Sequence, residues 1–187
     1  MKVSEIITDL GRDFKKEFSI GSEPLYSQYK KVYEILSFSE KGVLLVGSIG
    51  CGKSMLMKVM QRLFKDTNNA FRWVSSKDLK DMLDEAKPLD VKVKYGSSLK
   101  MNLYIDDIGV QTNKNDYGNV VNIISDLILE REELYSNENI KTHFSSNLPP
   151  FSKPNIESIE TVFGKRVVDR MAEMCEMVSW QSKSLRK

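Results

Sequence analysis

Gly47-Ser-Ile-Gly-Cys-Gly-Lys-Ser54 directly follows the apolar run Val43-Leu-Leu-Val46. These two adjacent segments are the strongest indication of the fold class. The pattern begins with a glycine and ends in Gly-Lys-Ser, which is typical of a phosphate-binding P-loop. Such a loop lies between a buried strand and a helix. The apolar run predicts the strand, and apolar residues at helical spacing between positions 56 and 63 predict the helix.

The residue types of this loop suit a nucleoside triphosphate. Glycines let the backbone approach phosphate oxygens, and successive N–H groups form an anion-binding concavity at the positive end of the next helix. We expect Lys53 to reach the β- and γ-phosphates and the Ser54 hydroxyl to bind Mg²⁺. The residues expected to cradle ATP are Gly47, Ser48, Ile49, Gly50, Cys51, Gly52, Lys53, Ser54 and Met55.

Length and composition bound the class of protein. A chain of 187 residues fits one α/β domain. The net charge of +2 means that any contact with nucleic acid must come from local patches. Two cysteines make no disulfide framework, and a cysteine in the phosphate loop indicates a reducing, cytoplasmic location. No apolar stretch approaches the length of a membrane span, and a single histidine argues against a histidine metal cluster or triad.

Three features leave two interpretations open. Cys51 is either a thiol with a lowered pKa at a helix N-terminus or a small residue whose backbone N–H binds phosphate. The tyrosines at helical spacing in residues 23–38 either pack into the core or shelter an adenine ring. The basic segment 87–100 is expected to be a loop or short hairpin that is either solvated or in contact with nucleic acid. The side chains concerned are Tyr26, Tyr29, Tyr33, Lys87, Lys92, Lys94 and Lys100.

Candidate strands and helices alternate along the chain, which predicts a three-layer α/β fold with a five-stranded, mostly parallel sheet and helices on both faces. Ser76 is the expected N-cap of one helix, and Pro88 its end. The expected strands are residues 42–47, 71–75, 101–105, 140–146 and 177–180. The expected helices are residues 2–19, 23–38, 53–65, 76–86, 119–136, 155–163 and 165–176.

Polar residues follow the expected strands at the edge where such sheets bind ligands. Asp106 comes after an apolar strand and fits the carboxylate that helps to hold Mg²⁺. Asp107 is the adjacent group that can orient and polarise an attacking water. Asn147 either orients the same water and senses the γ-phosphate or forms an Asx-turn before two prolines.

Two arginines lie four residues apart on an expected helix. Arg166 and Arg170 project together, either into solvent or as arginine fingers that complete the site of a neighbouring subunit. Such a finger contributes roughly 10³–10⁵ in rate in related systems.

Taken together, these segments resemble the AAA+ branch of P-loop ATPases, and within it the DnaC- and IstB-type ATPases, which are bacterial helicase loaders and transposition helpers. The P-loop resembles their Walker A motif, and Tyr104-Ile-Asp-Asp-Ile-Gly109 their Walker B. Thr142-His-Phe-Ser-Ser-Asn-Leu148 resembles their sensor-1 strand, and Phe163-Gly-Lys-Arg-Val-Val-Asp-Arg-Met171 their box VII, which makes Arg170 the better finger candidate. Ser184-Leu-Arg186 resembles their Ser-aromatic-Arg ending, with Leu in the aromatic position.

The resemblance covers about residues 40–187 and implies two parts, an N-terminal helical stub or linker at 1–40 and an AAA+ ATPase domain at 41–187. It implies an ATPase that assembles as a homo-oligomer on single-stranded DNA and loads or remodels a replicative helicase. Asp107 stands where the family often has Glu, so slow hydrolysis, stimulated by assembly or DNA, is expected.

Other functions remain open. A transposition helper of the IstB type would prefer duplex DNA and deliver a transposase. A small P-loop kinase would need an acceptor site and lid arginines, and an ATP-dependent scaffold would hydrolyse almost nothing. The strand between the two Walker motifs and the asparagine that ends the next strand argue against most such kinases.

Overall fold

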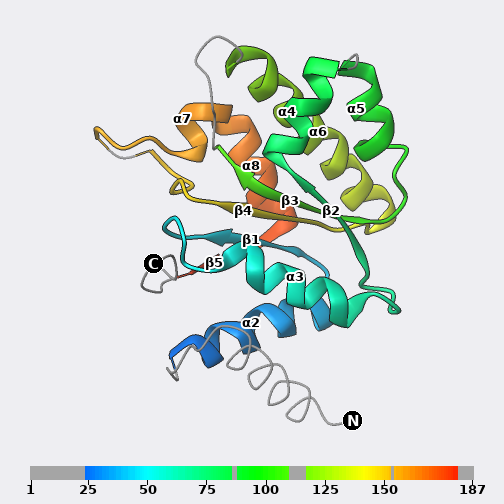
Figure 1. Cartoon of the computed structure of the whole chain (residues 1–187), viewed down its shortest axis with the longest axis vertical. Coiled ribbons are helices and arrows are strands. Elements are labelled where there is room, and N and C mark those ends of the chain that lie inside the picture. The colour runs from blue at the N-terminus through cyan, green and yellow to red at the C-terminus, as the bar shows by residue number, and fades with distance from the viewer. Residues whose placement is uncertain (1–23, 86–87, 110–116, 153, 181–187) are drawn as a thin grey trace.

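The computed structural model describes residues 24–85, 88–109, 117–152 and 154–180. The expected helix at 2–19, Lys87 and the Ser184-Leu-Arg186 ending lie outside these ranges. A five-stranded sheet in the order β2-β3-β4-β1-β5 forms the middle of the molecule. Its neighbouring strands are all paired in parallel, which confirms the predicted α/β fold (Figure 1). The strands are β1 (Gly42–Val46), β2 (Phe71–Ser75), β3 (Asn102–Ile108), β4 (Thr142–Ser146) and β5 (Cys175–Ser179).

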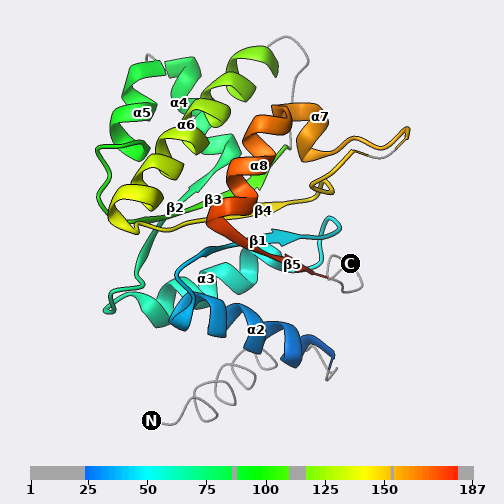
Figure 2. The same ribbon diagram turned by 180° about the vertical axis from the view of Figure 1, so that it is seen from behind.

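Helices cover both faces of the sheet, as the alternating pattern predicts (Figures 1 and 2). On one face, α2 (Pro24–Phe38) and α3 (Lys53–Phe64) enclose one apolar core cluster. On the other, the remaining helices enclose a second cluster. These helices are α4 (Ser76–Glu85), α5 (Pro88–Tyr95), α6 (Tyr117–Glu138), α7 (Ile159–Phe163) and α8 (Lys165–Met174).

Strand β4 is fully buried although most of its side chains are polar. Burial of polar groups is tolerated only where they form hydrogen bonds, and those of β4 do so. His143 Nδ1 accepts a 3.2 Å hydrogen bond from Val43 N, and Thr142 Oγ1 accepts one of 2.9 Å from the buried Arg131 guanidinium. The polar sequence of β4 therefore joins it to neighbouring elements through side chains as well as through the backbone.

Residues 88–95 of the basic segment are helical, so the prediction of a loop or hairpin was wrong for that part. Pro88 is the first residue of α5 and does not merely end the helix before it. Proline suits the first helical position because the missing N–H has no partner there in any case. The N-cap of α4 is also one residue earlier than expected, since Ser75 and Asp78 exchange hydrogen bonds with each other's backbone N–H.

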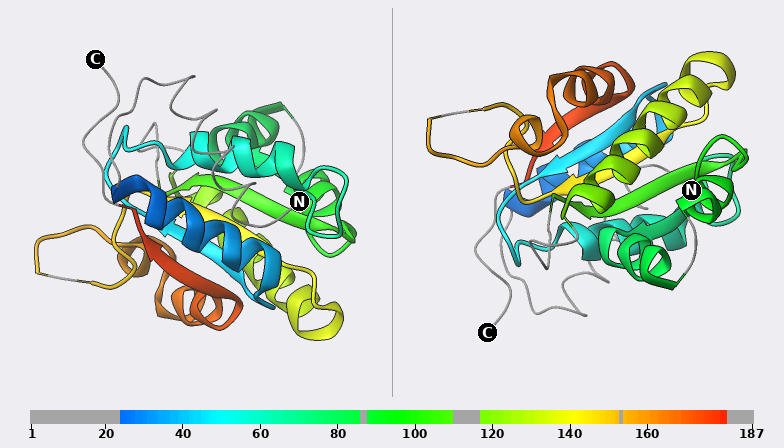
Figure 3. Two further views of the ribbon diagram at one scale, coloured as in Figure 1. Left: turned by 90° about the horizontal axis from the view of Figure 1, so that it is seen from below. Right: turned by 90° about the horizontal axis from the view of Figure 1, so that it is seen from above.

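Two strands differ from their expected bounds in ways that bear on the site. Strand β3 continues through Asp106 and Asp107 to Ile108, with an irregular register against β4 between Ile105 and Ile108. Strand β5 begins at Cys175, two residues before its expected start. At the carboxyl edge, β1, β3 and β4 end close together, since Val46 and Ile108 both pair with Ser146. Figure 3 shows the molecule from below and from above, with the helices in front of the sheet.

The helix before the sheet belongs to the same core. Val32, Ile35 and Leu36 of α2 are buried in the cluster that also holds β1 and α3 residues. The division of the chain at residue 40 stays a prediction. None of the helices in the described part of the chain is long and apolar enough to cross a bilayer.

Candidate functional site

The P-loop joins β1 to α3, and its backbone requires glycine. Gly50 and Gly52 have φ of 78° and 97°, in the left-handed region that L side chains rarely adopt. A Cβ on Gly47 would lie 2.1 Å from the carbonyl oxygen of Trp180, so no larger residue fits. The loop is therefore a tight turn that ends at the N-terminus of α3, as phosphate binding needs.

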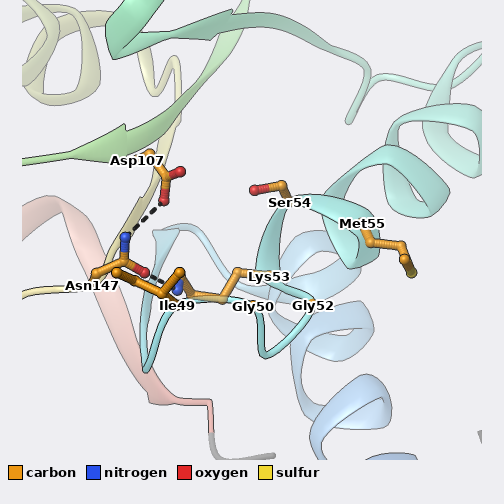
Figure 4. Close-up of a pocket in the computed structure, with 8 residues that line it drawn as sticks. All are labelled: Ile49, Gly50, Gly52, Lys53, Ser54, Met55, Asp107 and Asn147. Atoms are coloured by element: carbon orange, nitrogen blue, oxygen red, sulfur yellow. Dashed lines mark hydrogen bonds between the residues drawn. The ribbon is translucent and has the colours of Figure 1, made fainter. Parts of the chain in front are cut away.

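Lys53 is buried, and its ammonium group lies inside the loop. Its Nζ donates hydrogen bonds to the carbonyl oxygens of Gly47 (2.8 Å) and Ser48 (3.1 Å) and to Asn147 Oδ1 (2.6 Å). The contact with Asn147 links the start of α3 to the residue just past β4 (Figure 4). A lysine held in this position is ready to exchange protein acceptors for phosphate oxygens.

Asp106 lies beside Ser54, as the expected metal pair requires. Ser54 Oγ donates a 3.0 Å hydrogen bond to Asp106 Oδ1. A hydroxyl and a carboxylate in contact offer oxygen ligands of the kind that Mg²⁺ takes when phosphates supply others. The donor set therefore fits a magnesium–triphosphate complex, with Ser54 and Asp106 as the residues that would hold the metal.

Asp107 lines the pocket. Its backbone is left-handed, with φ of 55°, a conformation in which Asp and Asn are enriched among non-glycine residues. Asn147 Nδ2 donates a long 3.4 Å hydrogen bond to Asp107 Oδ1 (Figure 4). A pocket of about 220 Å³ opens between these groups, lined by Ile49, Gly50, Gly52, Lys53, Ser54, Met55, Asp107 and Asn147.

The structure thus gathers most of the expected site residues at one edge of the sheet, but not the arginines. Arg166 is exposed on α8. Arg170 Nη1 pairs with Glu173 at 2.7 Å, and its Nε lies 3.9 Å from Glu132 of α6. Neither arginine lines the pocket of its own chain.

Several residues of the site environment were missed from the sequence. Trp180, just past β5, is buried, and its Nε1–H donates a 2.8 Å hydrogen bond to the carbonyl oxygen of Cys51 in the P-loop. Its ring lies 5.2 Å from that of Tyr29 in α2. Tyr33 stacks on Phe64 of α3 at 5.6 Å, which supports core packing for this tyrosine.

The basic segment carries less free charge than its sequence suggests. Lys92 pairs with Asp126 at 2.7 Å, and Lys100 pairs with Glu138. Lys94 lies over the ring of Tyr95 at 5.4 Å. Local carboxylates therefore neutralise part of the patch that was considered for nucleic-acid contact.

No family model and no curated protein matches the sequence, so the comparison is with solved structures. The DnaC helicase loader superposes with a TM-score of 0.58 and 22% identity, over 81% of this chain and 86% of that one. DnaI superposes with a TM-score of 0.61 and 18% identity, over 89% and 87%. The chain has the AAA+ P-loop NTPase fold.

The AAA+ fold also extends to a larger protein. The replication initiator DnaA bound to AMPPCP and single-stranded DNA superposes with a TM-score of 0.57 and 17% identity. It matches 91% of this chain, which spans only 50% of that one. The likeness to these three structures is a likeness of fold.

Proposed function

We propose that this protein binds and hydrolyses ATP, assembles on single-stranded DNA and loads or remodels a replicative helicase. The observation that carries the proposal is the convergence of Lys53, Ser54, Asp106, Asp107 and Asn147 at one sheet edge of an AAA+ fold. The likeness to a DnaC helicase loader and to a DnaA bound to AMPPCP and single-stranded DNA favours replication over the transposition alternative.

Each residue of the pocket has a role in this proposal. Bound Mg²⁺ neutralises charge on the phosphates, and Ser54 and Asp106 hold it. Lys53 gives up protein acceptors for β- and γ-phosphate oxygens. Asp107 accepts a proton from, or orients, the attacking water, while Asn147 positions that water and contacts the γ-phosphate. The glycines and Met55 surround the phosphates at the start of α3.

Assembly completes the site. Arg170, with Arg166 one turn before it, would serve the nucleotide of a neighbouring subunit, since neither reaches the pocket of its own chain. ATP then acts as a switch for assembly as well as a fuel. Residues 1–40 would be the stub that meets the helicase, and residues 41–187 the ATPase domain.

The experiment is a measurement of mass by light scattering with ATP–Mg²⁺ and a single-stranded oligonucleotide, each alone and together. The wild-type chain should form a defined oligomer with both ligands present. Lys53→Ala should stay monomeric, because its phosphate contact is lost. Lys65→Ala, an exposed lysine just after the same helix, is the matched control and should assemble like the wild type.

Assembly of the wild type and of Lys53→Ala to the same degree would contradict a nucleotide switch. A wild-type chain that stays monomeric in every mixture would contradict the loader proposal. Stronger assembly on duplex than on single-stranded DNA would instead favour the transposition helper.

A further inference from the structure

The Asp106 carboxylate accepts hydrogen bonds from two side chains in addition to Ser54. Besides Ser54, Tyr104 Oη donates to Asp106 Oδ1 at 2.7 Å, and Ser145 Oγ donates to it at 2.6 Å. Three hydroxyl donors thus meet at a single oxygen. An oxygen that accepts three hydrogen bonds has little left to offer a metal, so a metal is expected to take Oδ2.

The two additional donors are buried and come from different strands. Tyr104 lies two residues before Asp106 on β3 and therefore on the same face of the strand. Tyr104 is fully buried, with 0% of its surface exposed. Ser145 of β4 is also 0% exposed.

Ser145 has a second contact that links both acids. Its Oγ accepts a 2.9 Å hydrogen bond from the backbone N–H of Asp107. The same hydroxyl therefore donates to the Asp106 carboxylate and accepts from the N–H of the next residue. At this point β3 has its irregular register against β4, and Asp107 has its left-handed φ. It fixes the carboxylate proposed to hold metal and the backbone of the residue proposed to orient water.

We propose that Tyr104 and Ser145 are positioning residues for Mg²⁺, which set the rotamer of Asp106 so that one oxygen faces the phosphates. This inference rests on the proposed ATP–Mg²⁺ site and adds the residues that tune its metal affinity. Hydrogen-bond partners of metal ligands change metal affinity by about 10- to 100-fold when removed. Tyr104→Phe removes one donor, and Ser145→Ala removes one donor together with the acceptor of the Asp107 N–H, each with little change of volume.

The test compares binding of a fluorescent ATP analogue in Mg²⁺ and in EDTA, without any measurement of hydrolysis. For the wild type, Mg²⁺ should strengthen binding. In Tyr104→Phe and Ser145→Ala, the Mg²⁺ concentration at half-maximal strengthening should rise by about 10-fold, while the affinity in EDTA stays the same. Tyr33→Phe, at another buried tyrosine, is the control and should match the wild type in both buffers.

The outcomes separate the inference from the function on which it rests. No gain from Mg²⁺ in the wild type would overturn the proposed magnesium site itself. A wild-type gain with an unshifted Mg²⁺ midpoint in both variants would overturn only the positioning role. Equal weakening in Mg²⁺ and EDTA would show general damage to the fold and would also overturn it. If Tyr104→Phe fails to fold, Ser145→Ala alone tests the same carboxylate. If both variants fold, the double mutant should show coupling, because both donors share one acceptor.

Discussion

Asp107 is the residue at which backbone and chemistry meet. Its left-handed φ of 55° suits Asp and Asn better than longer side chains, which gives a structural reason for Asp where the ATPases that the sequence resembles often have Glu. The same conformation turns its carboxylate toward Asn147 and the pocket (Figure 4).

Asp107→Asn keeps the shape and the backbone preference and removes the charge. We expect ATP hydrolysis to fall by about 100-fold or more, in the range of a lost general base, while ATP affinity changes little. Single-turnover hydrolysis and nucleotide binding measure the two effects separately. Asp66→Asn, at an exposed aspartate after α3, is the control. Unchanged hydrolysis in Asp107→Asn would remove this residue from the reaction.

The structure brings together residues that sequence patterns singled out, because each lies in a motif with fixed local geometry. The P-loop glycines, Lys53 and Ser54 follow from one turn and one helix. Tyr104 was missed although its spacing of two from Asp106 on a strand puts both on one face. Ser145 was unpredictable in its role, because the register between β3 and β4 decides which hydroxyl meets Asp106.

Among the elements, β5 positions the residue that follows it, Trp180, against the P-loop. The Trp180 indole binds the Cys51 carbonyl, and the Trp180 backbone closes on Gly47. This contact joins Trp180, the last residue that the structure describes, to the P-loop. No short sequence motif predicts it.

Trp180→Phe should weaken binding of ATP by about 3- to 10-fold, the value of one lost hydrogen bond, with the loop otherwise intact. Titration with a fluorescent nucleotide measures the change. Phe163→Leu, a buried aromatic position in the other core cluster, controls for general loss of packing. Full affinity in Trp180→Phe would show that the loop holds its shape without the indole.

His143 makes the pairing of β1 and β4 sensitive to acid. Burial, and then the charges of Lys141 and Arg131, lowers its pKa from 6.5 to about 3. The folded state therefore excludes a proton that the unfolded chain binds below its own pKa near 6.5. Stability should be full above that pH and fall as the pH drops toward 3.

The unfolding free energy should decrease by about 2 kcal/mol between pH 8 and pH 5 from this residue alone. Urea denaturation at the two pH values measures it. His143→Asn keeps an acceptor for Val43 N but does not titrate in this range. The unfolding free energy of this variant should therefore decrease by about 2 kcal/mol less between pH 8 and pH 5 than that of the wild type. An equal pH dependence in both proteins would contradict the assignment.

At the scale of the whole molecule, the site is proposed to need two chains. The helix–sheet layers were predictable because alternating strands and helices permit few topologies. The ion pair of Arg170 with Glu132 was not predictable, since it depends on how α8 packs on α6, whereas Glu173 lies three residues further along α8 itself. Box VII spacing alone thus left the direction of Arg170 undetermined.

Mixing two inactive variants tests the shared site. Arg170→Ala alone should lose about 10³-fold or more in hydrolysis, and Lys53→Ala should lose it through its own pocket. A mixture should recover part of the rate, because some interfaces combine an intact Lys53 with an intact Arg170. Arg62→Ala, an exposed arginine on α3, should behave as wild type. A mixture with no more activity than its components would contradict action between chains.

The hydrogen bonds from Lys53 through Asn147 to Asp107 have a further consequence. A phosphate that enters the loop does not find a free cation but competes with an amide oxygen already in place. Each exchange at Lys53 loosens the amide whose other end contacts Asp107. Phosphate binding at Lys53 and the contact between Asn147 and Asp107 would therefore be coupled. Because such coupling is reciprocal, a change at Asp107 would alter the ratio of the affinities for triphosphate and diphosphate by the factor by which phosphate binding alters the contact at Asp107. In the proposed function, the choice between triphosphate and diphosphate and the activation of water would both depend on Asn147.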